Sequence, residues 1–237
     1  NGSVLISGTS FAGNFSPEEL PKAVRFAHER GVLFFASLDD SRIPGEARGK
    51  GLPFIEGRMT VPFYAARYSA TKEAGCDGIY LFNAENEFMR ELAEIDPRQT
   101  DGMKKAYFAV DRGDGGYRCW HVLKDGGRYL NMPKLDPGIP MKVGPGETYR
   151  FSVFLGDDFA GRRPPKMTAQ ALTGLKEGSV AFTANGKSVR TVSSGNGLFT
   201  FELPAGILHR GINDFSVTFP KDAPKDLTFN DFAVFLD

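Results

Sequence analysis

Apolar runs and helical repeats alternate along the first hundred residues of the chain. Continuous apolar runs of strand length occur at 3–10, 32–38 and 78–83. Such runs are typical of strands that are buried on both faces of a parallel sheet. Apolar side chains at helical spacing, in segments that end at a glycine or near a proline, predict helices at 17–30, 60–74 and 85–95. Strict alternation of strands and helices predicts right-handed βαβ units.

The pattern changes after about residue 103, where helical spacing disappears. About eight short runs of alternating apolar and polar residues follow, separated by turn residues. Asn185-Gly186, between two such runs, is a strong signal for a two-residue hairpin turn. The expected fold of this part is a jelly-roll-like β-sandwich. We therefore expect two domains, an α/β part at 1–100 and an all-β part at 104–237.

The composition is that of a globular protein with balanced charge. Hydrophobic residues make up 41% of the chain and charged residues 24%, and 29 basic residues match 29 acidic ones. A formal net charge of zero, without a long basic block, argues against nucleic acid or an anionic membrane as a main partner. No apolar run is long enough to span a bilayer.

The chain lacks the short motifs that would indicate a metal or a cofactor. Cys76 and Cys119 lie far apart without metal-ligand spacing, so we interpret both as packing residues. No dinucleotide-binding, phosphate-binding, zinc-protease or serine-hydrolase motif occurs. His28 and His209 have no plausible partners in the sequence. The sequence therefore implies no metal and no cofactor.

Polar side chains gather where the second and third expected strands end. The second strand runs into Asp39 and Asp40, and the third runs into a stretch that contains Asn83, Glu85, Asn86 and Glu87. The carboxyl ends of parallel strands meet at one face of a sheet or barrel, where ligands and catalytic groups gather. We therefore predict catalytic acids at Asp39, Asp40 and Glu85, and substrate-binding groups at Asn83, Asn86 and Glu87.

A structural role is the alternative interpretation of these acids. In that case Asp39 or Asp40 caps a turn. Glu85 and Glu87 then lie in the first turn of the following helix, where the helix dipole stabilises acidic side chains. The sequence alone does not separate the two interpretations.

Three further residues are candidates for substrate binding. Arg42 and Arg48 lie in the long loop between the second strand and the second helix, and loops of this length are often functional. Trp120 lies in an expected sandwich strand, where an exposed ring would stack on a sugar. The alternatives are a solvated, salt-bridged surface loop and a core tryptophan.

Several long stretches carry a resemblance to a known architecture. In the first part of the chain they are SPEELPKAVRFAHERGVLFFASL and FYAARYSATKEAGCDGIYLFN. In the second part they are YLNMPKLDPGIPMKVGPGETYRFSVFLGDD, VAFTANGKSV, LFTFELPAGILHRGINDFSVTF and LTFNDFAVFLD. In these stretches and in their order, the chain resembles uncharacterised bacterial glycoside-hydrolase-like proteins, in which a (β/α)8 barrel precedes a small β-sandwich. The resemblance covers nearly the whole chain.

The resemblance implies that the first part is the end of a TIM-type barrel, with its last strands at 3–10, 32–38 and 78–83. Such a barrel takes about 250 residues and eight strands, so strands one to five would lie upstream and the numbering would start inside a longer precursor. In many glycosidase barrels the nucleophile follows the seventh strand and the acid/base follows the fourth. Asp39 or Asp40 would then be the nucleophile, and its partner is not in this chain. Because glycoside hydrolysis normally needs two carboxylates, we expect this chain alone to be inactive.

The function that the resemblance implies for the parent protein is hydrolysis of a glycosidic bond in a polysaccharide or glycoconjugate. The expected partners are carbohydrate and the missing N-terminal part of the barrel. A secreted or periplasmic location is implied by the resemblance alone. Two non-catalytic alternatives stay open for the sandwich: a carbohydrate-binding module and a structural support for the barrel.

Overall fold

The computed structural model describes residues 3–7, 19–39, 60–82, 96, 100–108, 141–159, 166–176 and 178–237. Expectations that fall elsewhere, including the helix at 85–95 and the strand around Trp120, lie outside the described residues.

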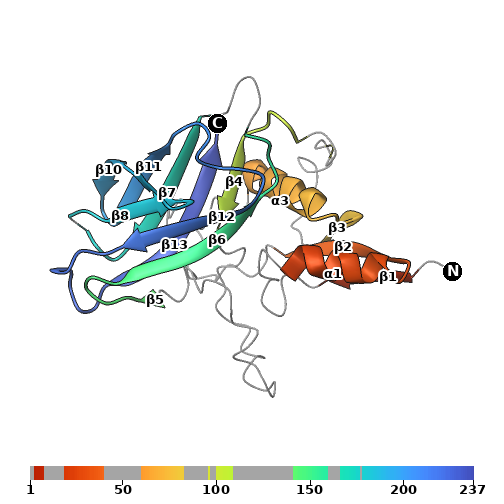
Figure 1. The fold of residues 1–237 in the computed structure, drawn as a ribbon, viewed down its shortest axis with the longest axis horizontal. Helices are drawn as coiled ribbons and strands as arrows, with labels where there is room; N and C mark the ends of the chain where they lie inside the picture. The colour runs from red at the N-terminus through yellow and green to blue at the C-terminus, as the bar shows by residue number, and fades with distance from the viewer. Residues whose placement is uncertain are drawn as a thin grey trace, which may run out of the picture.

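The first part of the chain alternates strands and helices, as its pattern predicted. Its elements are β1 (Ser3–Ser7), α1 (Glu19–His28), β2 (Val32–Asp39), α3 (Val61–Glu73) and β3 (Gly78–Phe82). The 3-stranded sheet has the order β1-β2-β3, and both strand pairs are parallel (Figure 1). The predicted parallel arrangement is confirmed, whereas the assignment of these units to the end of a TIM-type barrel, incomplete in this chain, stays a prediction.

Both helices lie on the same face of this sheet. Phe34 of β2 is buried against Val24 and Ala27 of α1. Ile79 of β3 is in register with Ala36 of β2 and packs against the apolar cluster of α3. Because alternate residues of a strand share a face, Phe34, Ala36 and Ile79 all point to the side that α1 and α3 cover.

Two large side chains are exposed on the opposite face of the sheet. Leu33 of β2 is 45% exposed, and Tyr80 of β3 is 42% exposed. Phe35 lies on the same face, where its ring crosses Gly78, and a Cβ at Gly78 would lie 2.4 Å from that ring. Parallel sheets are normally covered on both faces, so this face is suited to a further apolar partner.

A glycine turn ends α3 and leads directly into β3. Gly75 has a φ of 90°, a left-handed conformation that favours glycine. The Cys76 amide donates to the Thr71 carbonyl and the Gly75 amide donates to the Lys72 carbonyl, each at 3.0 Å. These two bonds are the Schellman arrangement, and they confirm the predicted end of the helix at Gly75.

The second part of the chain forms two antiparallel sheets. One has the order β10-β11-β7-β13-β4, with β5 paired to β13, and the other has the order β6-β12-β8-β9. The strands of the first sheet are β4 (Lys105–Phe108), β5 (Met141–Lys142), β7 (Met167–Thr173), β10 (Thr191–Gly195), β11 (Leu198–Leu203) and β13 (Thr228–Leu236). Those of the second are β6 (Thr148–Leu155), β8 (Ala181–Ala184), β9 (Lys187–Val189) and β12 (Gly211–Thr218).

Phenylalanine side chains hold the two sheets together. Phe182 of β8 stacks on Phe201 of β11 with ring centroids 4.2 Å apart. Phe151 of β6 meets Phe232 of β13 edge to face at 4.7 Å. Full burial of one such side chain contributes about 1.5–3 kcal/mol, so these pairs supply much of the core. Two packed antiparallel sheets are what the alternating pattern predicted, and the jelly-roll topology stays a prediction.

Two asparagine-glycine turns close hairpins in the sandwich. The predicted turn at Asn185 and Gly186 joins β8 to β9, with φ values of 47° and 74°. A second turn at Asn196 and Gly197 joins β10 to β11, with φ values of 51° and 85°. Positive φ at both central residues is the pattern of type I′ turns, which match the twist of hairpin strands. The strand β10 and its turn were not expected from the sequence pattern.

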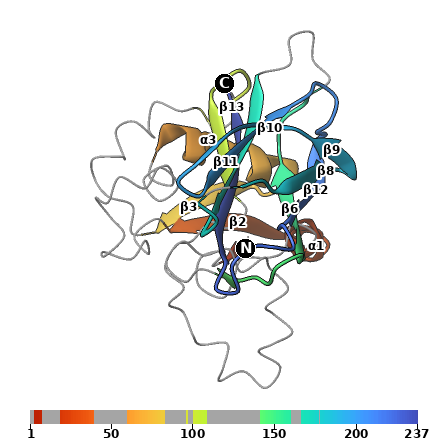
Figure 2. The same cartoon turned by 90° about the vertical axis from the view of Figure 1, so that its left-hand side faces the viewer.

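Helix α3 connects the two parts of the molecule. Figures 1 and 2 both show it beside β3 and beside β4, the edge strand of the first sandwich sheet. Phe63 of α3 meets Phe108 of β4 edge to face at 5.7 Å. Ala66 belongs to the apolar core of the sandwich. The helix therefore buries side chains against the parallel sheet and against the sandwich.

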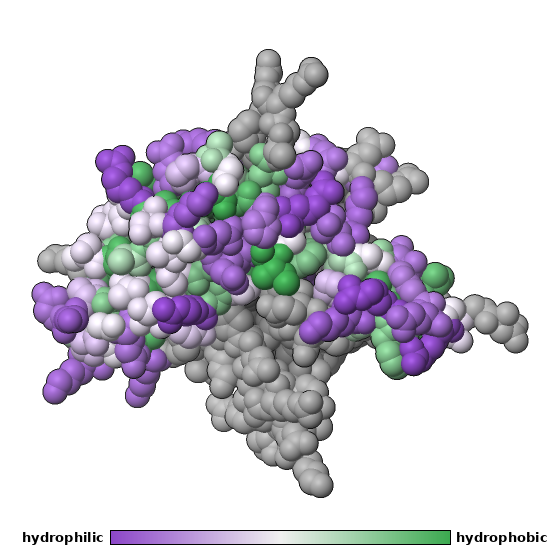
Figure 3. All heavy atoms as spheres, viewed as in Figure 1, coloured by the Kyte–Doolittle hydropathy of each residue, from purple (hydrophilic) through white to green (hydrophobic). Residues whose placement is uncertain are grey.

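The described surface is mainly polar on the side shown in Figure 3. Hydrophilic residues cover most of it, and apolar residues form small patches. Within the described part of the chain, no helix has the length and apolar character that crossing a membrane requires.

Candidate functional site

The sequence predicted a site at the carboxyl-terminal edge of the parallel sheet. Asp39, the last residue of β2, is in register with Phe82, the last residue of β3. Ser7, the last residue of β1, is in register with Ala36, so β2 extends beyond β1. Neighbouring strands lie about 4.8 Å apart. The segments that follow β2 and β3 therefore leave the sheet from adjacent points.

Of the predicted site residues, the structure describes only the backbone of Asp39. The others lie outside the described residues: Asp40, Arg42, Arg48, Asn83, Glu85, Asn86, Glu87 and Trp120. The register brings together the starting points of the two acidic segments. The positions of their side chains stay predictions.

The structure places a polar contact at the opposite edge of the sheet. Asp77 directly precedes β3, and its carboxylate accepts hydrogen bonds from the Phe34 amide and the His28 ring, each at 2.8 Å. The Asp77 amide donates in turn to the Phe34 carbonyl at 2.9 Å. The expectation that His28 has no plausible partner is therefore wrong, because its partner lies 49 residues away in the sequence. His209 also has a contact, with the carbonyl of Arg210 at 3.0 Å.

The Asp77 contact has a structural role. The Phe34 amide, followed by the His28 ring, holds the pKa of Asp77 below its usual value against the opposing effect of partial burial. The contact ties α1, β2 and β3 together at the amino-terminal edge of the sheet. In barrels, residues at that edge serve stability and the other edge carries the chemistry.

The described residues offer no evident metal site. They contain no group of three or more His, Cys, Asp or Glu side chains that could hold a metal ion. Cys76 is a half-buried free cysteine that packs against the cluster of α1 and β2. Burial raises the pKa of Cys76 to about 11, so the thiol stays protonated and unreactive at neutral pH.

A buried polar cluster lies between α3 and the sandwich. The Nζ atom of Lys105 is 2.5 Å from Oδ1 of Asp157, and the Lys105 side chain is 1% exposed. The Tyr107 phenol donates a hydrogen bond to the other carboxylate oxygen of Asp157. Burial, and then the negative charge of Asp157, raises the pKa of Tyr107 well above its usual value. Because solvent barely reaches Lys105, we interpret this cluster as structural.

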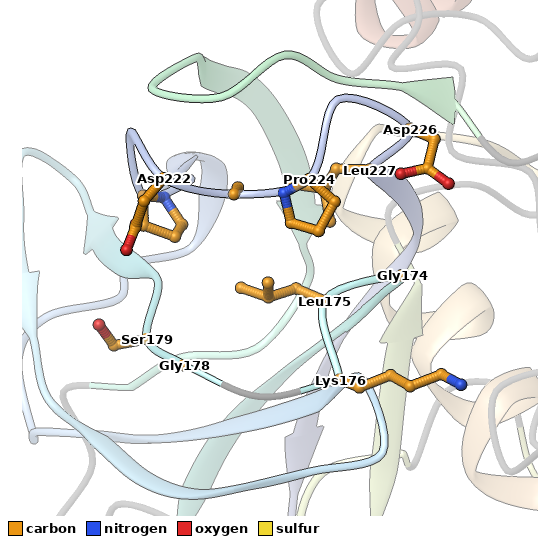
Figure 4. Close-up of a pocket in the computed structure, with 11 residues that line it drawn as sticks. Gly174, Leu175, Lys176, Gly178, Ser179, Asp222, Pro224, Asp226 and Leu227 are labelled. Atoms are coloured by element: carbon orange, nitrogen blue, oxygen red, sulfur yellow. The ribbon is translucent and has the colours of Figure 1, made fainter.

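A surface hollow of about 630 Å³ lies between the loops that join β7 to β8 and β12 to β13. Figure 4 shows Asp222 and Ser179 on one side of it and Leu175 near its centre. The charged groups of Lys176 and Asp226 point away from it. Sugar-binding sites commonly use an aromatic platform, and no described residue that lines the hollow is aromatic. We assign no ligand to it.

Comparisons with known proteins do not place the chain in a family. No family model and no curated protein matches it. Among solved structures, it is similar to wild-type BuGH86 and to a variant of that protein, both in complex with neoagarooctaose. Each match has 18% sequence identity and a TM-score of 0.31, and covers 40% of this chain and 17% of the other. A likeness at this level does not establish a shared fold.

Proposed function

We propose that this chain is the C-terminal part of a glycoside-hydrolase-like protein that acts on a polysaccharide or glycoconjugate. The observation that carries the proposal is the placement of Asp39 at the carboxyl end of β2, beside the end of β3, in an all-parallel sheet. The next residue, Asp40, adds a second carboxylate at the edge where such sheets gather catalytic groups. In this proposal residues 1–100 are the end of a barrel and residues 104–237 are its appended sandwich.

The position of the helices favours a closed barrel rather than an open sheet. In a closed barrel all helices lie outside, whereas an open doubly wound sheet has helices on both faces. Here α1 and α3 share one face, and Leu33 and Tyr80 are exposed on the other. Further strands would bury that second face as the interior of the barrel. Among the described strands, β1 and β3 are the edges of this sheet, and exposed strand edges favour pairing with further strands.

In the proposed chemistry, the two catalytic carboxylates come from two different parts of the parent protein. Asp39 or Asp40 acts as the nucleophile or as the base that activates water. A second acid, carried by an upstream strand, protonates the leaving group. In the proposal Glu85 is a further catalytic acid, and the residues that bind substrate are Arg42, Arg48, Asn83, Asn86, Glu87 and Trp120. This chain by itself is then inactive.

The test is an assay for released reducing sugar with a polypeptide that extends upstream of residue 1. We expect hydrolysis of at least one glycan, and a loss of at least about a thousandfold in the double variant Asp39→Asn, Asp40→Asn, because a glycosidase without its nucleophile keeps little activity. Asp222→Asn, in the sandwich, is the matched control and should retain the full rate. An undiminished rate in the double variant would refute the assignment of these two acids.

The location that accompanies this function is the secreted or periplasmic space, which rests on the resemblance alone. The competing function is a non-catalytic module that binds carbohydrate or supports an assembly. The competing function would be supported if an extended polypeptide bound glycans on an array but released no sugar from any of them. That result would leave the parallel sheet as a scaffold.

A further inference from the structure

The backbone of α3 touches the end of β6 directly. Gly156 follows β6, and a Cβ at this position would lie 2.2 Å from the carbonyl carbon and oxygen of Ser69 in α3. No side chain fits in that space, so the approach of helix and strand depends on glycine. The backbone of Gly156 does not adopt the positive φ that favours glycine, so its role is steric and not conformational.

Hydrogen bonds reinforce this contact. The Gly156 amide donates to the Tyr107 hydroxyl oxygen at 3.2 Å. The Ser69 side chain lowers the pKa of Tyr107 against the larger raising effects of burial and Asp157, and the Tyr107 phenol donates to Asp157. Lys105 completes the group through its 2.5 Å contact with Asp157. One connected network therefore joins β4 to the residues that follow β6, where Gly156 lies against the Ser69 backbone of α3.

The apolar contacts of α3 reach both sides of β4. Phe63, Tyr64 and Tyr68 form one cluster with the outward residues of β4 and β13, which are Ala106, Phe108 and Ala233. Ala66 instead joins the cluster between the two sheets, which also contains Tyr107 and Leu155. Strands β4 and β6 are edge strands of different sheets. The helix therefore covers the open side of the sandwich between these two edges.

We infer that α3 is an integral element of the sandwich, so that residues 60–75 and the two antiparallel sheets fold and open as one cooperative unit. The sandwich is then a fixed support for the β2-α3-β3 unit and not a detachable glycan-binding module. Without α3, the apolar outer face of β4 and the Lys105–Asp157 pair would lose their cover. This inference does not depend on any catalytic activity and goes beyond the proposed function.

Native-state hydrogen exchange of the full 237-residue chain tests the inference. If α3 opens only with the sandwich, the protection factors of the slowest amides of α3 should lie within about tenfold of those in β6, β12 and β13. Helix α1, whose main contact among the described elements is with β2, serves as a reference within the same sample. A gap of more than about tenfold between α3 and the sandwich strands would overturn the inference.

A pair of glycine variants tests the coupling separately. Gly156→Ala forces the helix and the strand apart, so protection should fall by the same factor in α3 and in the sandwich, by at least about tenfold. Gly195→Ala is the control. Gly195 lies in the exposed strand β10, where a Cβ would meet nothing within 4 Å, so the protection factors of α3 and of the sandwich strands should stay unchanged. Loss of protection in α3 alone, or in the sandwich alone, would contradict the cooperative unit even if the unmodified chain shows similar factors.

Discussion

Helices α1 and α3 cover the same face of one parallel sheet, yet their surroundings differ. In α1, Val24 and Ala27 are buried against β2, whereas Phe26 on the far side is 59% exposed. In α3, seven residues are buried, and they contact both the sheet and the sandwich. Among the described elements, the first helix packs mainly on the parallel sheet and has an amphipathic sequence. The second packs on the sheet and on the sandwich and has apolar residues around its circumference. The distribution of apolar residues thus reports how many neighbours a helix has.

The largest effect should come from removing the buried cation at the junction of α3 and the sandwich. Lys105→Met leaves Asp157 buried without its ion-pair partner, and we expect a loss of about 3–5 kcal/mol in the free energy of unfolding by urea. Lys104→Met is the matched control, because Lys104 makes an exposed 3.5 Å pair with Asp237. That variant should lose less than about 1 kcal/mol. Equal losses in the two variants would show that the buried cluster has no special role.

A pair of phenylalanine variants compares the helices directly. Phe63→Ala in α3 removes a ring that is 5% exposed and packed on Phe108, and should cost about 3 kcal/mol of unfolding free energy. Phe26→Ala in α1 removes an exposed ring whose main contact is the Arg30 guanidinium, 3.6 Å from its centroid. That loss should be about 0.5–1 kcal/mol. Similar costs, measured by urea unfolding, would remove the distinction between the two helices.

The smallest expected effect concerns acid stability at the Asp77 contact. The folded-state pKa of Asp77 lies below the unfolded value of about 3.9. The carboxylate therefore stabilises the fold above that value, and this contribution is lost as the pH falls through the folded-state pKa. Asp77→Asn should lower stability at neutral pH and flatten its decline in acid. Urea midpoints measured between about pH 6 and about pH 3 provide the check.

The exposed Asp222 serves as the control for that measurement. Asp222→Asn replaces an exposed side chain of the sandwich that takes no part in the Asp77 contact, so it should leave the urea midpoints as they are in the unmodified protein. An acid dependence in Asp77→Asn that matches the unmodified protein would show that the His28 and Phe34 contacts contribute nothing to stability.

Local signals in the sequence predicted the elements well. The continuous apolar run at 32–38 became β2, and the glycine after residue 74 ended α3 by a Schellman turn. Asn185-Gly186 formed the expected hairpin, whereas β10 was missed because its serines and exposed Val192 give no alternating pattern. The candidate acids were predicted from their positions at the ends of strands. Among them, the structure describes only the backbone of Asp39. Their chemistry is still a prediction.

The sequence by itself determined most of the described strands and helices, because hydrophobic period and turn residues act over a few neighbours. Only the tertiary structure decided that Lys105 is buried against Asp157, 52 residues away, and that His28 meets Asp77. A lysine beside another lysine at the start of a strand has no local feature that marks it as buried. Its burial depends on α3 closing the edge of the sandwich. The energy of such contacts depends on the surrounding dielectric and packing, which form only when distant segments meet.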